Sequence, residues 1–365
     1  MLAKKVLIIG PFSPPITGVS FANDTLIKGL KGYNLTVDFI DYSYPTLSED
    51  IGKLSLKKIL YYFKLYFYAY KIPKSNTIYM TPGQTFFGVL KYYPFILISK
   101  IFKKETIIHV HGDYLWKEFK NLKGVKQNIF RFVLSKFNKG IVLSPKLRRN
   151  LKPFLKDDNI YEVYNFVENN IFNKVTLTDI QNKNIKELNI VYLSNLIKEK
   201  GIFDLLESLL LLKNKNISFK ASIAGAIDSS SKKELDIFFR KLKKEVKYLG
   251  VVRNDAKLKL LLNSNIFVFP TFYKMEGQPI SILEAMATGN IIMTTDHAGI
   301  SDIFNENKNG VFIEKNNPKD IAKKLETISL EIQKYTHITI NNHLESKKKY
   351  TTQNFVSNIL EIIKK

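Results

Sequence analysis

Short apolar runs of four to six residues alternate with helical patterns along most of the chain, and this alternation restricts the fold more than any other feature. The first run, Val6–Ile9, ends in a loop rich in proline and glycine. A helical stretch follows from about Ser20 to Leu30, and Leu35–Ile40 then has the pattern of a second strand. Fully apolar runs are typical of parallel strands that are buried on both faces. The sequence therefore opens with a βαβ unit.

The same alternation continues and then restarts after a polar segment, which predicts an α/β chain with two doubly wound, Rossmann-like domains that face a cleft. We expect domain boundaries at 1–168 and 188–335, a linker over 169–187, and closing helices over 336–365. The further strands expected in the first domain are Thr77–Met80, Thr106–Val110, Gly140–Leu143 and Ile160–Val163. Those expected in the second are Asn189–Leu193, Phe219–Ile223, Val246–Leu249, Ile266–Phe269 and Ile291–Thr294.

Length and composition agree with this organisation. A chain of 365 residues, 45% of them hydrophobic, can build two domains with cores of their own. The sequence has no cysteine, which excludes disulfides, thiolate metal sites and a cysteine nucleophile. The first ten residues are too short in apolar sequence for a secretory signal, and no window reaches the length of a membrane-spanning helix. We therefore expect a cytoplasmic protein.

The formal net charge of +23 leans toward the first half of the chain, where residues 1–180 hold 27 basic and 13 acidic residues. Basic residues alternate with aromatic ones in Lys57–Tyr68, and a second basic, apolar stretch runs from Tyr92 to Lys104. Such segments are typical of a solvated face over a core, of a surface for anionic lipid, or of a nucleic-acid groove. A groove is the least favoured of the three, because the charge is spread through both halves.

The strongest chemical signal lies in residues 269–289. A strand is expected to end near Pro270, and an acidic loop follows it. Pro279 then suits the first helical position, and Gly289 stands where the helix should stop. The amides at the start of this helix suit an anion such as a diphosphate. Glu276 and Glu284 bracket this position and could accept hydrogen bonds from ligand hydroxyls. The alternative is one surface glutamate and one that faces the helix interior.

This Glu-x7-Glu block, with its Glu-Ala-Met-Ala-Thr-Gly sequence, resembles the donor-site signature of the group-1 (family 4) retaining glycosyltransferases of the GT-B fold. The resemblance extends over essentially the whole chain, but its motifs are specific mainly in the second half. It implies that Glu276 meets hydroxyls of the donor sugar and that Glu284 accepts from the nucleotide ribose. The residues implied to line the diphosphate and the sugar are Gly277, Gln278, Pro279 and Ile280.

A second element is Lys200–Gly201, where a lysine at the mouth of a sheet can neutralise a leaving diphosphate. The family pattern at this place is Gly-Arg-x-x-x-x-Lys-Gly, whereas this chain has Asn195 in place of the arginine. Asn195, Lys200 and Gly201 are therefore the predicted donor-binding residues here, and Lys198 is the basic residue that could compensate.

Two histidines, His109 and His111, flank Val110 at the end of a predicted strand, and we expect only one of them to face a ligand. In the family, the histidine directly before glycine points at the donor sugar near the reacting carbon. The resemblance therefore implies a catalytic His111, with His109 in the core or behind it. A His-x-His metal site is rejected, because no further histidine or cysteine pattern supports it.

Thr17–Gly18, in the first loop, resembles the family's Gly-Gly step, where the backbone approaches phosphate and acceptor; Gly18 is the predicted contact. A dinucleotide site with Asp41 as the ribose carboxylate is the competing interpretation. It is disfavoured, because Gly-x-Gly-x-x-Gly is absent and the loop prolines lack amide donors. Weaker matches are Ser144, Asn165, Gly225 and the turn Ala298–Asp302. Gly250–Arg253 resembles the loop that meets the nucleotide base, so Arg253 joins the predicted donor contacts.

Taken with its context, the resemblance implies transfer of a sugar from a nucleotide-sugar to a saccharide or lipid-linked saccharide with retention of configuration. UDP-sugar is expected in preference to GDP-sugar, with no cofactor and no metal, since no Asp-x-Asp motif stands out. The implied pathway is surface polysaccharide, capsule or lipopolysaccharide assembly, with peripheral contact to an anionic membrane from the cytoplasmic side. The alternatives are a nucleotide-sugar epimerase or a phosphorylase on the same fold, and a basic nucleic-acid-binding protein.

Overall fold

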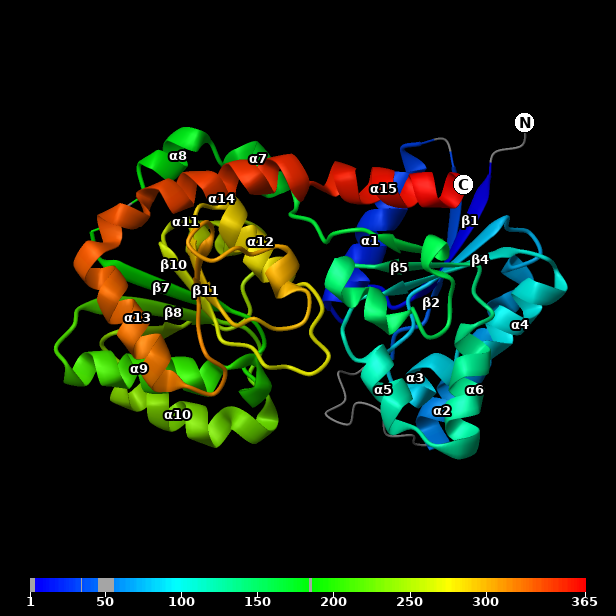
Figure 1. Cartoon of the computed structure of the whole chain (residues 1–365), viewed down its shortest axis with the longest axis horizontal. Helices are drawn as coiled ribbons and strands as arrows, with labels where there is room; N and C mark the ends of the chain where they lie inside the picture. Colours follow the sequence, from blue (N-terminus) through cyan, green and yellow to red (C-terminus); the bar gives the residue numbers. More distant parts are fainter. Residues whose placement is uncertain (1–3, 34, 45–55, 184–185) are drawn as a thin grey trace. The chain divides into compact units, whose positions relative to one another are not determined.

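The computed structural model describes residues 4–33, 35–44, 56–183 and 186–365, with the backbone alone for 56–59. The chain divides into two compact units. The first unit comprises residues 1–165, 275–278 and 352–365, and the second comprises 166–274 and 279–351. Both units contain a parallel sheet that is covered by helices (Figure 1). The predicted α/β class with two doubly wound domains is therefore confirmed.

The described strands of the first unit form one parallel six-stranded sheet of order β2-β1-β3-β4-β5-β6. The pairing of β1 with β2 runs from Lys5 opposite Thr36 to Gly10 opposite Asp41, so the predicted opening βαβ unit is confirmed. The central strands are buried on both faces, as their apolar sequences predict. The six strands are β1 (Lys5–Gly10), β2 (Thr36–Asp41), β3 (Thr77–Met80), β4 (Glu105–Val110), β5 (Lys139–Val142) and β6 (Ile160–Glu162).

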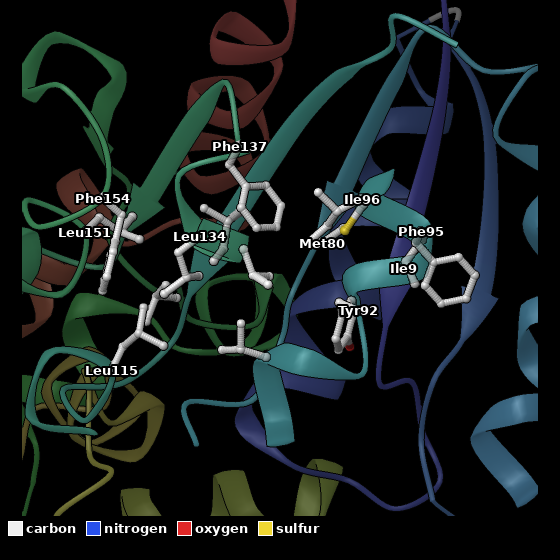
Figure 2. Close-up of a cluster of buried hydrophobic side chains, with 14 of the residues drawn as sticks. Ile9, Met80, Tyr92, Phe95, Ile96, Leu115, Leu134, Phe137, Leu151 and Phe154 are labelled. Carbon is white, nitrogen blue, oxygen red and sulfur yellow. The ribbon is translucent and has the colours of Figure 1, made fainter. Parts of the chain in front are cut away.

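One face of this sheet packs on the helices that connect β2 to β5. Strand residues such as Ile9 and Met80 meet helix residues such as Phe95 and Leu134 in a continuous apolar cluster (Figure 2). These helical elements are α2 (Leu56–Leu65), the 3₁₀ helix η1 (Tyr66–Lys71), α3 (Phe86–Leu90), α4 (Tyr93–Ile101), α5 (Leu115–Asn121) and α6 (Gly124–Leu134). Two further 3₁₀ turns precede β6, η2 (Pro145–Asn150) and η3 (Asp157–Asn159).

The chain ends on α15 (Thr352–Lys364), which packs against α1 (Gly18–Lys31) within the first unit (Figure 1). Gly29 of α1 allows this approach, because a Cβ there would lie 2.8 Å from Cγ1 of Val356 and 3.1 Å from its Cβ. The thirteen residues of α15 include a buried apolar face of phenylalanine, valine, leucine and isoleucine. The sequence pattern predicted closing helices here, but it did not indicate the unit that the last one joins.

The described strands of the second unit also form one parallel six-stranded sheet, of order β12-β11-β10-β7-β8-β9. Its chain order starts in the middle, so that β7 and β10 are neighbours and the connections run outward in opposite directions from them. A ligand site is expected at this point of reversal, beyond the carboxyl ends of the strands. The strands are β7 (Leu188–Leu193), β8 (Phe219–Ala224), β9 (Val246–Tyr248), β10 (Ile266–Phe269), β11 (Ile291–Thr294) and β12 (Gly310–Phe312).

Helices cover both faces of the second sheet, with α9 and α13 packed together on one face and α12 and α14 on the other (Figure 1). Two short helices, α7 (Asn169–Lys174) and α8 (Leu177–Gln181), occupy the segment predicted as a linker. The others are α9 (Ile202–Asn214), α10 (Lys232–Lys241), α11 (Asn254–Leu262), α12 (Ile280–Ala287), α13 (Pro318–Glu331) and α14 (Thr336–Lys349). The short 3₁₀ turns are η4 (Lys198–Lys200), η5 (Ser229–Ser231), η6 (Ile300–Asp302) and η7 (Ile332–Tyr335).

Candidate functional site

The loops that follow β7 and β10 meet at the point of reversal in the second sheet. Gly201 has a left-handed backbone with φ of +78°, and a Cβ there would lie 2.6 Å from the carbonyl carbon of Pro270. The amide of Phe272 donates to the carbonyl of Glu199 at 2.8 Å. Glycine is therefore required at 201 both for its backbone conformation and for the close approach. The sequence predicted these two segments as separate donor elements, and the fold brings them together.

Lys200 lies in this place, with its ammonium 5.5 Å from the ring centre of Phe269 and 5.2 Å from that of Tyr273. Both distances lie within the range of cation–π attraction, so the two rings hold the lysine head beside the end of β10. The hydroxyl of Tyr192 donates to the carbonyl of Lys200 at 3.3 Å, which fixes the backbone at this lysine. The lysine is thus positioned by aromatic contacts.

Asn195, which replaces the family arginine, is exposed on the same loop. Its carbonyl accepts hydrogen bonds from the hydroxyl of Tyr192 at 3.2 Å and from the amide of Ile197 at 3.0 Å. Lys198 is also exposed, and its charge acts on Asp204 in the first turn of α9. A second cation therefore stands near this edge of the sheet even though the arginine is absent.

The helix α12 follows the acidic loop as the sequence predicts, with one shift at its start. Pro279 precedes the first helical residue, Ile280, where the prediction put the proline itself at the first helical position. This is a small correction, because an extended ψ of 120° leaves Pro279 outside the helix. Gly289, with φ of +66°, follows the helix end as expected. Pro279 is buried, and Ile280 is half-buried.

Glu284 is buried inside α12 and forms an ion pair that sequence reasoning missed. Lys257 of α11 places its ammonium 2.5 Å from Oε1 of Glu284 and 2.9 Å from Oε1 of Glu168. Burial raises the pKa of Glu284 above its usual value, although the charge of Lys257 partly opposes this. Burial also opposes the charge on Lys257, but the two carboxylates raise the pKa of that lysine above its ordinary range. No spacing rule connects residues 168, 257 and 284, so no sequence pattern indicates this cluster.

His111 lies after β4 in the first unit, and His109 lies directly against it. The two ring centres are 3.9 Å apart with an angle of 34° between the rings. Residues i and i+2 of an extended chain point to the same side, so both rings lie on one side of the chain, and the expectation that only one of them faces a ligand stays a prediction. Nδ1 of His109 contacts the hydroxyl of Tyr79, which places His109 behind His111, as expected. Burial lowers the pKa of His111 to about 3, so its ring is neutral near pH 7.

The loop Met275–Gln278 belongs to the first unit and brings Glu276 and Gly277 beside His111. A Cβ on Gly277 would collide with the carbonyl oxygen of His111 and lie 2.9 Å from Cα of Gly112. Gln84 supports the other side of the loop, because its Nε2 donates to the carbonyl of Met275 at 3.3 Å. Glu276 is 8% exposed and Gly277 is buried. Glu276, Gly277 and His111, each predicted to meet the donor sugar, are therefore neighbours.

Gln278 has a structural use in the same loop. Its Oε1 accepts from the backbone amide of Asn165 at 2.6 Å, and its Nε2 donates to the carbonyl of Leu143 at 3.2 Å. The side chain of Asn165 donates back to the carbonyl of Gln278 at 2.7 Å. Both polar atoms of the Gln278 side chain are therefore bonded to Asn165 and Leu143, so only the backbone of Gln278 remains for the predicted contact with the donor.

The other predicted contacts lie at loop ends. Thr17, which stands where the family has glycine, caps α1: its hydroxyl accepts from the amide of Ser20 at 3.1 Å, and Oγ of Ser20 accepts from the amide of Thr17 at 2.8 Å. Gly18 is exposed, with open space around the position of a Cβ. Arg253 is exposed and precedes the first residue of α11. Among the described residues, no three histidine, aspartate or glutamate side chains are grouped as a metal site.

Comparisons with known proteins agree with this architecture. Residues 174–344 match the family model of glycosyl transferases group 1. An uncharacterized glycosyltransferase of Methanocaldococcus jannaschii is 24% identical over 374 residues, which cover 99% of this chain and 98% of the relative. The putative colanic acid biosynthesis glycosyltransferase of Escherichia coli is 25% identical over 146 residues, or 39% of this chain and 36% of the relative. The chain thus spans less than half the length of this relative, and 44% of another from M. jannaschii.

A solved structure has the same fold throughout its length. The Anabaena protein solved in complex with UDP-glucose superposes with a TM-score of 0.73 at 15% identity and covers 99% of both chains. Two doubly wound units with this likeness have the GT-B fold. Residues 174–344 match the group-1 glycosyltransferases, so the resemblance seen in the sequence is confirmed for that part of the chain.

Proposed function

We propose that the chain transfers a sugar from a nucleotide-sugar, a UDP-sugar in preference to a GDP-sugar, to a saccharide or lipid-linked saccharide with retention of configuration. The observation that carries this proposal is the loop Met275–Gln278, in which the backbone of Gly277, the residue after Glu276, lies against the backbone of His111 in the first unit. Three residues with separately predicted contacts to the donor sugar are thereby neighbours. The complex of the Anabaena protein with UDP-glucose supports the choice of donor.

In the proposed donor complex, Glu284 accepts a hydrogen bond from the ribose, and Lys200 offsets the charge of the leaving diphosphate. Arg253 and the loop before it meet the base. The amides around Gly277 and Ile280 add dipoles that favour an anion. Stabilising the charge that develops on a leaving group is commonly the largest single contribution to such catalysis. No metal is required for this arrangement.

The reaction exchanges one bond at the anomeric carbon. The bond to the phosphate oxygen breaks with its electron pair on the leaving nucleoside diphosphate, and the acceptor oxygen forms the new bond and passes its proton to the departing diphosphate. His111 is neutral near pH 7, because burial lowers its pKa to about 3. We therefore assign His111 to hydrogen bonding with the sugar, and Glu276 to an interaction with its hydroxyls.

The direct test measures acceptor-dependent release of nucleoside diphosphate from a panel of nucleotide-sugars. Glu276→Gln is expected to lower the rate about 10²-fold, since it removes a charged partner that acts on the reacting sugar. Glu361→Gln, which changes an exposed glutamate of α15, is the matched control and should keep the wild-type rate. A Glu276→Gln variant that transfers at the wild-type rate would contradict the assigned role.

The acceptor side of the proposal includes docking on an anionic membrane, and the first unit has a surface of suitable chemistry. Apolar side chains at helical spacing are exposed in four elements, α2, η1, α4 and α6. Phe67 of η1 is 76% exposed and Val125 of α6 is 73% exposed. We call this set the apolar surface: Leu60, Phe63, Phe67, Leu97, Ile101, Val125, Ile129 and Phe132. Exposed apolar stripes of this kind are typical of interaction surfaces.

Aromatic contacts join the elements that carry the apolar surface. Tyr66 of η1 packs on Phe95 of α4 with ring centres 5.3 Å apart, and Tyr93 of α4 packs on Phe132 of α6 at 6.2 Å. Residues 56–138 hold fifteen of the basic residues and three acidic ones, so about half of the net charge lies in this segment. Lys57 and Lys58 of the predicted basic stretch have side chains outside the described residues.

Flotation with lipid vesicles tests this surface. We expect the protein to float with vesicles that contain phosphatidylglycerol and to stay behind with phosphatidylcholine alone, because basic segments are attracted to anionic headgroups. The double variant Phe63→Ser, Phe67→Ser should reduce flotation, whereas Leu330→Ser, at a side chain 81% exposed in the second unit, should not. Equal flotation with both lipids at low salt would contradict the docking surface. Among the described residues, no helix is long and apolar enough to cross a membrane.

A further inference from the structure

Glu284, the proposed ribose contact, also forms an ion pair with Lys257. The side chain of Glu284 is 4% exposed, and a carboxylate in such a place is costly unless a cation compensates it. Lys257 provides that cation at 2.5 Å from Oε1, and Glu168 contacts the other side of the same ammonium at 2.9 Å. All three residues belong to the second unit.

The protonation state of Glu284 decides what it can offer a nucleotide. Ribose hydroxyls bind a carboxylate as donors, and an ionised carboxylate is an acceptor at both oxygens. A protonated Glu284 would lose acceptor capacity and present a proton of its own. The hydrogen bond from Lys257 reaches Oε1, and among the described residues no hydrogen bond reaches Oε2. The geometry thus leaves one oxygen for a ligand.

We propose that Lys257 is a positioning residue of the donor site, which keeps Glu284 ionised and fixes Oε1 so that Oε2 can accept from a ribose hydroxyl. This inference rests on the proposed ribose contact of Glu284. Glu168 has a different part: its negative charge balances the ammonium, but it also opposes ionisation of Glu284. The lysine is therefore the member of the cluster on which donor binding depends.

In the described part of the chain, no second cation near Glu284 could replace the charge of Lys257. The charged groups that act on it are Lys257 and Glu168. His343 of α14 also faces α12, but its Nδ1 contacts the carbonyl of Ala287 at 2.7 Å, at the far end of the helix. Lys259, two residues after Lys257 on α11, is exposed and provides a matched control position.

The experiment compares binding of a nucleoside diphosphate with binding of its 2′-deoxy and 3′-deoxy forms by titration calorimetry. The probe is whichever of UDP, GDP, ADP and CDP stabilises the protein most. We expect the wild-type protein to bind the ribose form about tenfold more tightly than at least one deoxy form, as for a hydrogen bond to a charged group. Lys257→Met should lose this preference near pH 7 and recover it as the pH rises and Glu284 ionises. Lys257→Arg and Lys259→Met should keep the wild-type preference at both pH values.

Each outcome separates the inference from the function on which it rests. If wild-type protein binds both deoxy forms as tightly as the ribose form, the ribose contact of Glu284 is wrong. If the wild-type protein shows the preference and Lys257→Met shows it equally at every pH, the role of Lys257 is wrong. Should Lys257→Met fail to fold, Lys257→Gln keeps a hydrogen-bond donor without the charge and is expected to show the same pH dependence. A merely structural lysine would instead weaken the ribose and deoxy forms alike.

Discussion

Asn165 and Gln278 hold each other through two hydrogen bonds, although 113 residues separate them. The backbone amide of Asn165 donates to Oε1 of Gln278 at 2.6 Å, and Nδ2 of Asn165 donates to the carbonyl of Gln278 at 2.7 Å. The remaining amide group of Gln278 donates to the carbonyl of Leu143 at 3.2 Å. This arrangement fixes the loop that carries Glu276, so the position of a proposed sugar contact depends on a side chain that need not touch the sugar.

Gln278→Leu should therefore release the loop. The change leaves the amide of Asn165 and the carbonyl of Leu143 without their partner, at a cost of about 1–3 kcal/mol for a buried polar group. We expect faster hydrogen exchange over residues 275–278 and a lower free energy of unfolding in urea. Gln333→Leu, at an exposed glutamine, is the control. Unchanged exchange in the Gln278 variant would show that the loop is held by other contacts.

Gly277 should not tolerate a side chain. A Cβ at this position would collide with the carbonyl of His111, while the backbone of Gly277 has no positive φ that itself requires glycine. Gly277→Ala is therefore expected to displace the loop and lower the transfer rate by at least about tenfold, since small displacements at a reacting centre are costly. In Gly83→Ala the new Cβ would make an ordinary contact of 3.5 Å, so the rate should stay near that of the wild type. Equal rates in the two variants would rule out the close approach as a requirement.

The low pKa of His111 should make the protein less stable in mild acid. Burial holds the pKa of His111 at about 3, below the ordinary value of 6.5, so the unfolded chain binds more protons between these values. Stability must then fall as the pH drops from about 6.5 toward 3. His111→Gln should flatten this dependence in urea unfolding measured at pH 7.5 and pH 5. His337→Gln, at an exposed histidine, should keep the wild-type slope, and identical slopes in all three proteins would contradict the burial of a neutral His111.

Asp204 should have the opposite effect on the pH dependence of stability, because its pKa is raised in the folded state. Burial, with a smaller contribution from Glu207, raises the pKa of this carboxyl to about 6. A raised pKa in the folded state means that the group favours folding at low pH and that this contribution is lost as the pH rises from about 4 through 6. Asp204→Asn is thus expected to raise the melting temperature at pH 7.5 and to leave it unchanged near pH 4. Asp236→Asn, at an exposed aspartate of α10, should raise it at neither pH.

The strands could be predicted because most of them are continuous apolar runs. Thr77–Met80 and Ile266–Phe269 are buried along their whole length, and their bounds agree with the prediction. The three-residue strand β12 was not predicted, because Gly310–Phe312 is too short to show a period. The bounds of the helix α12 could be predicted from Pro279 and Gly289. Proline favours the start of a helix, and Gly289 adopts the positive φ that follows the helix end.

The candidate site could be predicted only as separate segments. Spacing indicates that Glu276 and Glu284 flank the start of a helix, but it does not reveal which distant side chains meet them. Lys257 reaches Glu284 from another helix, and Asn165 holds the loop of Glu276 from a different part of the chain. Such contacts follow from the sheet order and from packing, which leave no periodic signal. A separation of two residues puts the rings of His109 and His111 on one side of the chain, and only the contact with Tyr79 shows which of them lies behind the other.

If this chain binds a nucleotide-sugar through its second unit, a nucleoside diphosphate should raise its melting temperature. The measurement uses UDP, GDP, ADP, CMP, NAD and a short oligonucleotide, with the wild-type protein and with Glu284→Ala. We expect a clear rise with one nucleoside diphosphate, a smaller rise with the same ligand in Glu284→Ala, and none with NAD or the oligonucleotide. No rise with any nucleoside diphosphate, or a rise with NAD or the oligonucleotide alone, would contradict this expectation.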